Sequence, residues 1–223
     1  MPQQKSKKIY LYIFLFFFIG TFNNKNLTDL NFFEINSIYV SGLPDEKNLE
    51  ILKNLKLYEI NNLFFLKKSQ IKKLISSFDY VENYTVFKKY PSSLNIELSE
   101  TIYLAYITKD DKLFYVGSNG KLIKAKDKKK NLPYIFGKFD MKKFFELKKI
   151  TDKLNFNFKE IKSLYYFPSG RWDLEINSGI LIKLSKDKLE KSLELSLAVL
   201  NDENFKNLKI IDVRQANQVI IDG

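Results

Sequence analysis

Residues 80–100 read YVENYTVFKKYPSSLNIELSE and predict a pair of adjacent strands. The first half is rich in valine, tyrosine and phenylalanine, and it ends at the turn signal Pro91-Ser92-Ser93. In the second half Leu94, Ile96 and Leu98 alternate with polar residues. Because successive side chains of a strand point to opposite faces, the pattern predicts a hairpin with one buried face. Other elements must cover that face.

Three elements before the hairpin can cover it. Residues 33–40 alternate well enough for a strand, which the breaker sequence Ser41-Gly42-Leu43-Pro44 ends. Residues 46–55 and 67–78 carry apolar side chains at helical spacing. The resulting order, β-α-α-β-β, predicts a small unit with one amphipathic sheet covered by two helices.

The chain beyond residue 102 is rich in predicted strands, with two predicted helices. Gly117-Ser118-Asn119-Gly120 indicates a hairpin turn. Residues 139–154 and 189–200 are predicted helices, the second with Ser185 as a possible N-cap. Further strands are expected at 161–166, 172–176, 180–184, 208–213 and 218–221. We therefore expect an α+β fold: an N-terminal transmembrane helix, the β-α-α-β-β unit, and a mostly antiparallel β domain with two helices.

The N-terminus carries an apolar run that predicts a membrane segment. Residues 9–22, IYLYIFLFFFIGTF, hold no charge and follow Lys5, Lys7 and Lys8. A basic flank favours a cytoplasmic N-terminus, so residues 1–8 are expected as a cytoplasmic tail, 9–24 as an uncleaved transmembrane signal-anchor and 25–32 as a linker. A cleaved signal peptide or a soluble helix are the alternatives. The expected membrane residues are Ile9, Leu11, Phe14, Phe17, Ile19 and Phe22.

Composition excludes several kinds of chemistry. The chain has no cysteine and no histidine, so it can build no Cys–His pair, no Ser–His–Asp triad and no His/Cys zinc site. We expect no enzyme, cofactor, metal or small-molecule substrate. The net charge is +11, but Arg171 and Arg214 are the only arginines. Specific base reading relies on arginine, so we expect no nucleic acid. The basic run Lys126–Lys130 is expected to be a solvated loop.

Several short sequence motifs of this chain resemble those of one protein family in their order and spacing. They are the hairpin of residues 80–100 and five other stretches: Ile38-Tyr39-Val40-Ser41-Gly42, Asn62-Leu63-Phe64-Phe65-Leu66, Leu132-Pro133-Tyr134-Ile135-Phe136-Gly137, Arg171-Trp172-Asp173-Leu174 and Ile211-Asp212-Val213-Arg214. Together with the N-terminal run they resemble the FtsQ/DivIB family of bacterial cell-division proteins. The resemblance implies a POTRA domain, a small docking module, at 33–101 and an FtsQ-type β domain at 102–223. Thr101, Tyr103 and Gln218 depart from the family pattern.

The resemblance implies a scaffold that links early and late division proteins at the septum. The implied partners are FtsB and FtsL, with FtsK, FtsW and FtsI as further candidates. The implied location is the inner membrane, as a single-pass type II protein with its bulk in the periplasm. Two other classes remain: a POTRA component of outer-membrane assembly or secretion, and a membrane-anchored Ser–Lys peptidase using Ser37 or Ser41.

The last predicted strand is the candidate binding site. A terminal strand is a natural sheet edge, and its unpaired backbone groups can accept a partner strand. The alternative is that Val219 and Ile221 are simply core. Trp172 is expected in the core rather than at an interface, and Asp212 is expected to pair with Arg214. The candidate partner-binding residues are Arg171, Arg214, Gln215, Asn217, Gln218, Val219, Ile220 and Ile221.

Overall fold

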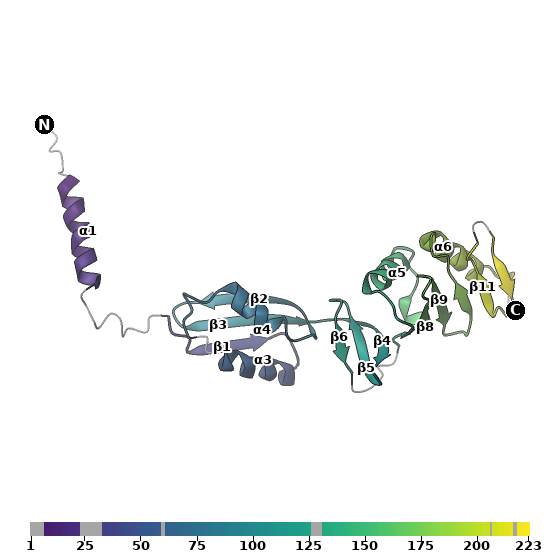
Figure 1. Ribbon diagram of the computed structural model, residues 1–223, viewed down its shortest axis with the longest axis horizontal. Coiled ribbons are helices and arrows are strands. Elements are labelled where there is room, and N and C mark those ends of the chain that lie inside the picture. Colours follow the sequence, from purple (N-terminus) through teal and green to yellow (C-terminus); the bar gives the residue numbers. More distant parts are fainter. Residues whose placement is uncertain (1–6, 23–32, 59–60, 126–130, 206, 216–217) are drawn as a thin grey trace. The chain divides into compact units, whose positions relative to one another are not determined.

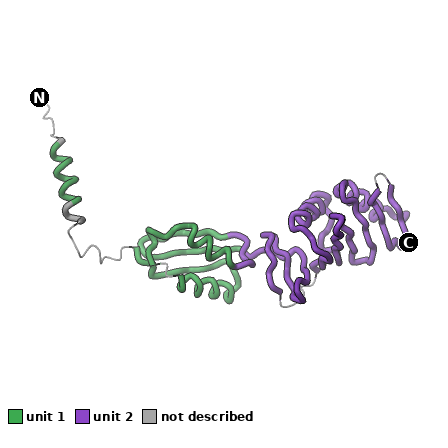
Figure 2. Tube along the Cα trace, in the orientation of Figure 1, with its two compact units in different colours: residues 1–77, 84–99 green, residues 78–83, 100–223 purple. Residues whose placement is uncertain are grey.

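The computed structural model describes residues 7–22, 33–58, 61–125, 131–205, 207–215 and 218–223. They divide into two compact units: residues 1–77 with 84–99, and residues 78–83 with 100–223 (Figure 2). The expected linker 25–32, most of the expected cytoplasmic tail, the basic run at 126–130 and Asn217 lie outside the described residues. The predicted boundary between residues 101 and 102 stays a prediction.

Helix α1 covers Lys7–Phe22, a length of 16 residues. In the part of the chain that the structure describes, no helix combines the length and the apolar character that crossing a membrane requires. At 1.5 Å per residue α1 rises about 24 Å, compared with about 30 Å for the hydrocarbon core of a bilayer. The transmembrane helix expected over residues 9–24 is therefore not found in the described residues, and Asn23 and Asn24 lie outside them.

The predicted β-α-α-β-β order is confirmed in the small sheet (Figure 1). Strand β1 pairs in parallel with β3, so β3 is the middle strand and the order is β1-β3-β2. Both helices bury one apolar stripe against this sheet, and Ile51 and Ile71 are among its fully buried side chains. The elements are β1 (Ser37–Ser41), α3 (Asp45–Leu57), α4 (Lys68–Ile75), β2 (Val81–Lys89) and β3 (Ser93–Glu100).

The second unit is built on a nine-stranded sheet of order β12-β11-β10-β9-β8-β7-β4-β5-β6. Five of its strand pairings are antiparallel and three are parallel, so the sheet is mixed. Strands β4 and β7 were not predicted individually. The strands are β4 (Tyr103–Lys109), β5 (Lys112–Gly117), β6 (Leu122–Lys124), β7 (Tyr134–Phe136), β8 (Ile161–Tyr166), β9 (Trp172–Ile176), β10 (Leu181–Lys183), β11 (Ile210–Asp212) and β12 (Ile220–Asp222).

Two parallel pairs each enclose a helix. Helix α5 (Met141–Lys153) connects β7 to β8, and α6 (Leu189–Leu200) connects β10 to β11. Strands β8 and β10 run in the same direction because β9 is antiparallel to both. Both crossovers step the same way along the sheet, so the right-handed rule places both helices on one face. Phe144 of α5 and Leu193 of α6 indeed share one buried cluster with Leu174, Ile182 and Ile211, and Figure 1 shows the two helices on the same side.

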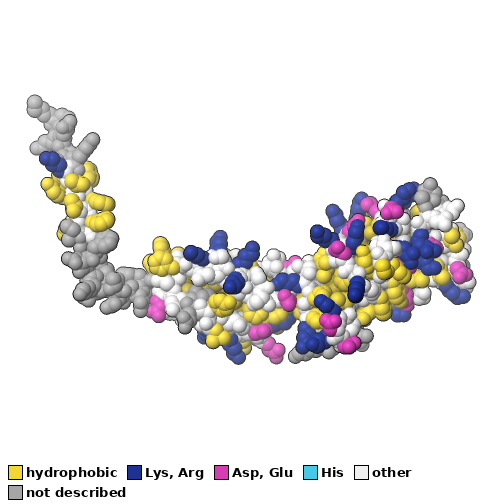
Figure 3. All heavy atoms as spheres, in the orientation of Figure 1, with side chains coloured by type: hydrophobic (Ala, Val, Ile, Leu, Met, Phe, Trp, Pro, Cys, Tyr) yellow, Lys and Arg dark blue, Asp and Glu magenta, His cyan; other side chains and the backbone are white. Residues whose placement is uncertain are grey.

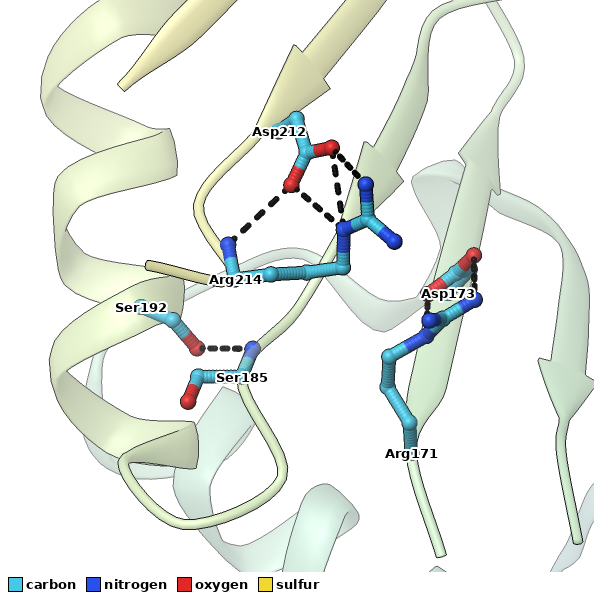
Figure 4. A network of polar contacts seen from close by, with 6 residues as sticks. All are labelled: Arg171, Asp173, Ser185, Ser192, Asp212 and Arg214. Atoms are coloured by element: carbon cyan, nitrogen blue, oxygen red, sulfur yellow. Dashed lines mark hydrogen bonds and ion pairs between the residues drawn. The ribbon is translucent and has the colours of Figure 1, made fainter. Parts of the chain in front are cut away.

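The expected N-cap of the last helix is wrong. Helix α6 begins at Leu189, and Lys188 occupies the cap position without a side-chain cap bond. The Ser185 backbone N–H instead donates to Ser192 Oγ at 3.2 Å (Figure 4). The helix therefore starts three residues after the position that a Ser185 cap would set, and the serine pair fastens its first turn to the end of β10.

Gly137, which follows β7, is required by a close approach of two backbones. Its φ is +93°, and a Cβ there would lie 2.2 Å from the Tyr166 carbonyl oxygen. Gly179 has a similar φ of +89° but nothing within 4 Å of an added Cβ.

We predict that Gly137→Ala lowers the free energy of unfolding clearly more than Gly179→Ala does. Gly179→Ala should incur only the cost of the left-handed backbone conformation, about 1–2 kcal/mol. Urea unfolding followed by the fluorescence of Trp172, the one tryptophan, measures both; equal losses would contradict the role of the contact.

Candidate binding edge of the nine-stranded sheet

Strand β12 forms one edge of the sheet. It pairs with β11 in antiparallel register, with Ile211 opposite Ile221, and no other strand of the described residues pairs with it. In a strand paired on one side, the backbone N–H and C=O groups of alternate residues point away from the sheet. The last strand therefore presents hydrogen-bonding groups that a second extended chain can match.

The side chains of this edge divide between the two faces. Val219 and Ile221 are half-buried and pack against the core, as the alternative to a binding role predicted. Ile220 points the other way and is 55% exposed, and Gln218 is exposed as well. The edge is thus held in place by its core face, while its other face and its backbone remain accessible.

A row of charged residues crosses the sheet toward this edge. Lys183 on β10 lies opposite Asp173 on β9 and also opposite Asp212 on β11. Asp212 in turn lies opposite Ile220 on β12. Residues in register share a face, and the next row, with Leu174, faces the helices. The row Asp173–Lys183–Asp212–Ile220 therefore lies on the helix-free face.

The two arginines hold the two aspartates of this row (Figure 4). Arg171 donates from Nε and Nη2 to the Asp173 carboxylate at 2.9 and 3.1 Å. Arg214 donates from Nε to Asp212 Oδ1 at 2.8 Å and from Nη2 to Oδ2 at 2.5 Å. Such two-point pairs fix the guanidinium geometry as well as the charge. The predicted Asp212–Arg214 pair is confirmed, whereas the Arg171–Asp173 pair was not predicted.

The two carboxyl groups respond to their surroundings in opposite directions. Burial raises the pKa of Asp173, an effect that outweighs the opposing hydrogen bonds and charge of Arg171. The hydrogen bonds of Arg214 lower the pKa of Asp212. The difference follows from exposure, because the Asp173 side chain is almost completely covered and Asp212 lies nearer to solvent.

Arg214 and Ile220 also meet at a shallow hollow of about 300 Å³, which Asp212 and Gln215 complete. The structure thus brings together Arg214, Gln215 and Ile220 from the predicted set. Arg171 lies farther along the sheet on the approach to β9, where its guanidinium also lies 4.3 Å from the ring centre of Phe167. Trp172 is 2% exposed, which confirms its predicted place in the core.

An aromatic ladder on the helix-free face was missed in the sequence. The rings of Tyr106 and Tyr134 lie 5.2 Å apart, and Phe136 stacks on Tyr165 at 4.9 Å. The Tyr165 hydroxyl donates to Glu175 at 2.8 Å. The alternation of Tyr134 and Phe136 was the available signal, but three residues are too few to establish a strand period.

In the described residues no group of three or more metal-binding acidic side chains occurs.

These features define a two-module protein whose second module offers an open sheet edge with Arg214, held by Asp212, beside it. A model of the FtsQ-type POTRA domain matches residues 33–101, and a model of the C-terminal part of the cell division protein FtsQ/DivIB matches residues 105–214. The chain belongs to the FtsQ/DivIB family of cell-division proteins.

Curated relatives carry the same names. A cell division protein DivIB from Clostridium tetani is 29% identical over 104 residues, which are 47% of this chain and 39% of that protein. The cell division protein FtsQ of Rickettsia typhi is 27% identical over 199 residues, with 85% and 72% covered. A DivIB from Clostridium botulinum strain Loch Maree is 25% identical over 225 residues, with 93% and 88% covered.

We predict that Asp212→Asn destabilises the second unit in a pH-dependent manner. A carboxyl group whose pKa is lowered by folding adds stability above its unfolded pKa, near 3.9, and the gain is lost as the pH falls through the folded value. Relative to the wild type, the variant should lose about 1–3 kcal/mol at neutral pH and almost nothing at strongly acidic pH. Urea unfolding monitored at Trp172 measures both. The exposed Asp222→Asn serves as the control, and a loss that persists unchanged in acid would contradict the ion-pair origin.

Proposed function

We propose that the chain is a scaffold of the bacterial division machinery that docks a partner by adding the partner's strand to β12. The observation that supports this is the accessible backbone edge of β12, with Val219 and Ile221 anchored in the core and Ile220 facing outward. Strand addition supplies affinity through main-chain hydrogen bonds, and alternate side chains supply selectivity. Within this proposal residues 33–101 are the POTRA domain and 102–223 the β domain.

The arginines add a polar component to the docking edge. The bonds to Asp173 and Asp212 use the Nε and Nη2 side of each guanidinium. A guanidinium has five N–H donors, so the Nη1 side can bind a carboxylate or carbonyl of a docked segment. Arg214 and Gln215 border the hollow beside Ile220 and are placed for this contact, while Arg171 lies two strands farther from the edge. Asn217 and Gln218 belong to the same proposed segment.

Family membership supports division proteins as the class of partner. We propose FtsB, paired with FtsL, as the ligand of the β12 edge, and FtsK, FtsW or FtsI as partners of the POTRA domain. The role is that of an adaptor which brings proteins together and performs no chemistry of its own.

We further propose that α1 anchors the chain in the inner membrane at the septum, with the N-terminus in the cytoplasm and residues 33–223 in the periplasm. The apolar run is uncharged from Ile9 to Phe22, and the described side chains from Ile9 to Phe18 are exposed, as the hydrophobic surface of this helix in Figure 3 shows. A helix shorter than the hydrocarbon core can be accommodated by local thinning of the bilayer. Lysines before the run suit a cytoplasmic flank.

The two rival classes find less support. A Ser–Lys peptidase needs a lysine with a depressed pKa beside Ser37 or Ser41, and the sequence around these two serines carries no motif that indicates one. An outer-membrane assembly component would be expected to continue into a series of alternating strands of about ten residues, whereas β6, β7, β10, β11 and β12 have three residues each.

We predict that Ile220→Lys weakens binding of a purified FtsB–FtsL complex without changing the stability of the second unit. The side chain is exposed on the docking face, so the charge disturbs the docked strand and not the core. Ile102→Lys, at an isoleucine that is 68% exposed in the same unit, is the matched control and should bind normally. Calorimetric titration measures both; equal affinities for the two variants would rule out this face of β12.

Hydrogen exchange tests strand addition itself. Binding should slow exchange at backbone amides of residues 218–222, because the added strand covers the outward N–H groups. Strand β6 forms the opposite edge of the same sheet and should exchange as before. Protection at β6 in place of β12 would contradict the proposed edge.

A further inference from the structure

Four exposed aromatic side chains gather at one end of the small domain. Phe33 stacks with Phe64 at 5.9 Å between ring centres and meets Tyr90 edge-on at 5.4 Å, and Phe64 meets Phe65 at 5.4 Å. Phe64 is 61% exposed and Phe65 73% exposed. We refer to Phe33, Phe64, Phe65 and Tyr90 as the aromatic rim.

Backbone hydrogen bonds and buried neighbouring side chains hold the rim residues in their exposed positions. Leu63 and Leu66 on either side of the two phenylalanines are buried. The Leu63 N–H donates to the Phe33 carbonyl at 2.7 Å, and the Phe64 N–H donates to Asn62 Oδ1 at 2.9 Å. The aliphatic residues of this segment fill the core, and the larger aromatic ones are held in solvent. An exposed aromatic group of this size indicates a contact surface.

Lysines flank the rim residues in the sequence. Lys67 and Lys68 follow Leu66, and Lys88 and Lys89 precede Tyr90. Lys88 Nζ donates to the Leu66 carbonyl at 2.8 Å, which fixes one ammonium group at this end of the domain. Glu34 is the acidic neighbour of Phe33, so lysines outnumber acids among the described residues here. Aromatic side chains flanked by lysine suit the headgroup layer of an anionic bilayer.

The length of the linker limits how far the rim can lie from such a surface. Ten residues, 23–32, separate Phe22 at the end of α1 from Phe33, and the eleven residue steps between the two span at most about 40 Å when fully extended. If α1 is the membrane anchor, as proposed above, Phe33 cannot lie farther than this from the membrane boundary. We propose that the aromatic rim inserts into the headgroup region of an anionic bilayer, as a second membrane contact of the chain; this rests on the anchor in the proposed function.

The experiment places nitroxide labels in the full-length chain reconstituted in phosphatidylethanolamine–phosphatidylglycerol vesicles. The chain has no cysteine, so each introduced cysteine is labelled uniquely. Asn61→Cys reports on the rim, Lys73→Cys on the last turn of α4, away from the helix start beside the rim, and Phe16→Cys on α1. Relative accessibility to oxygen, which partitions into lipid, and to a water-soluble nickel chelate measures the environment of each label.

The expected result is a lipid-like ratio at residues 61 and 16 and a water-like ratio at residue 73. Adding Phe64→Ser and Phe65→Ser should abolish the lipid-like ratio at residue 61 and leave that at residue 16 intact. Leu49→Ser, at another exposed apolar residue of the domain, is the matched control and should change neither. Vesicles of phosphatidylcholine alone should reduce the effect at residue 61.

The outcomes separate this inference from the proposed anchor. A water-like label at residue 61 with a lipid-like label at residue 16 overturns the rim contact and leaves the anchor standing. The reverse pattern overturns the anchor and supports the rim. Water-like labels at both positions overturn both. Burial of the rim against a second copy of the chain would appear as protection of residue 61 from both relaxants and would overturn the lipid contact.

Discussion

The handedness of two crossover connections determines which face of the nine-stranded sheet its helices cover. Helices α5 and α6 both connect parallel neighbours, and both connections step in the same direction along the sheet. Right-handed crossovers then place both helices on one face, where Phe144 and Leu193 enter a single core. In the part of the unit that the structure describes, the other face carries no helix, and β12 pairs with the side of β11 that β10 leaves free. The uncovered face thus follows from the handedness of the crossovers, whereas the accessible edge follows from the pairing of β12 on one side only.

A sheet face without helices must satisfy its own polar groups. Here the Asp173–Lys183–Asp212 row alternates in charge across three strands, and Arg171 and Arg214 close its two ends. Removing one member of a covered ion pair leaves a charge that water cannot fully solvate. Burial raises the pKa of Asp173, and the hydrogen bonds and charge of Arg171, with the charges of Arg214 and Lys183, oppose that rise. The pairing with Asp212 also holds Arg214 beside the edge, so a docked segment would not have to order it.

Local sequence patterns predicted most elements but not how distant ones meet. The hairpin of residues 80–100 became β2 and β3 nearly as drawn, because alternation over many residues is a strong signal. Strand β7 has three residues, too few for a period to be recognised. The parallel pairings of β7 with β8 and of β10 with β11 were not predicted either, because they depend on crossover connections and not on local sequence patterns. Arg171 was predicted as a candidate contact residue, but its hydrogen bonds to Asp173 were not predicted. The N-terminal run formed a helix that ends at Phe22.

The two proposed contact surfaces share a physical design. In β12, Ile221 is held by the core and Ile220 is turned outward by the period of a strand. In the aromatic rim, Leu63 and Leu66 are buried and hold Phe64 and Phe65 in solvent. In each case the residues that fix the segment alternate closely with those that are exposed, so little conformational entropy remains to be lost on binding. Both proposed surfaces are ordered before they bind, and they suit different ligands: a partner's backbone and a charged apolar interface.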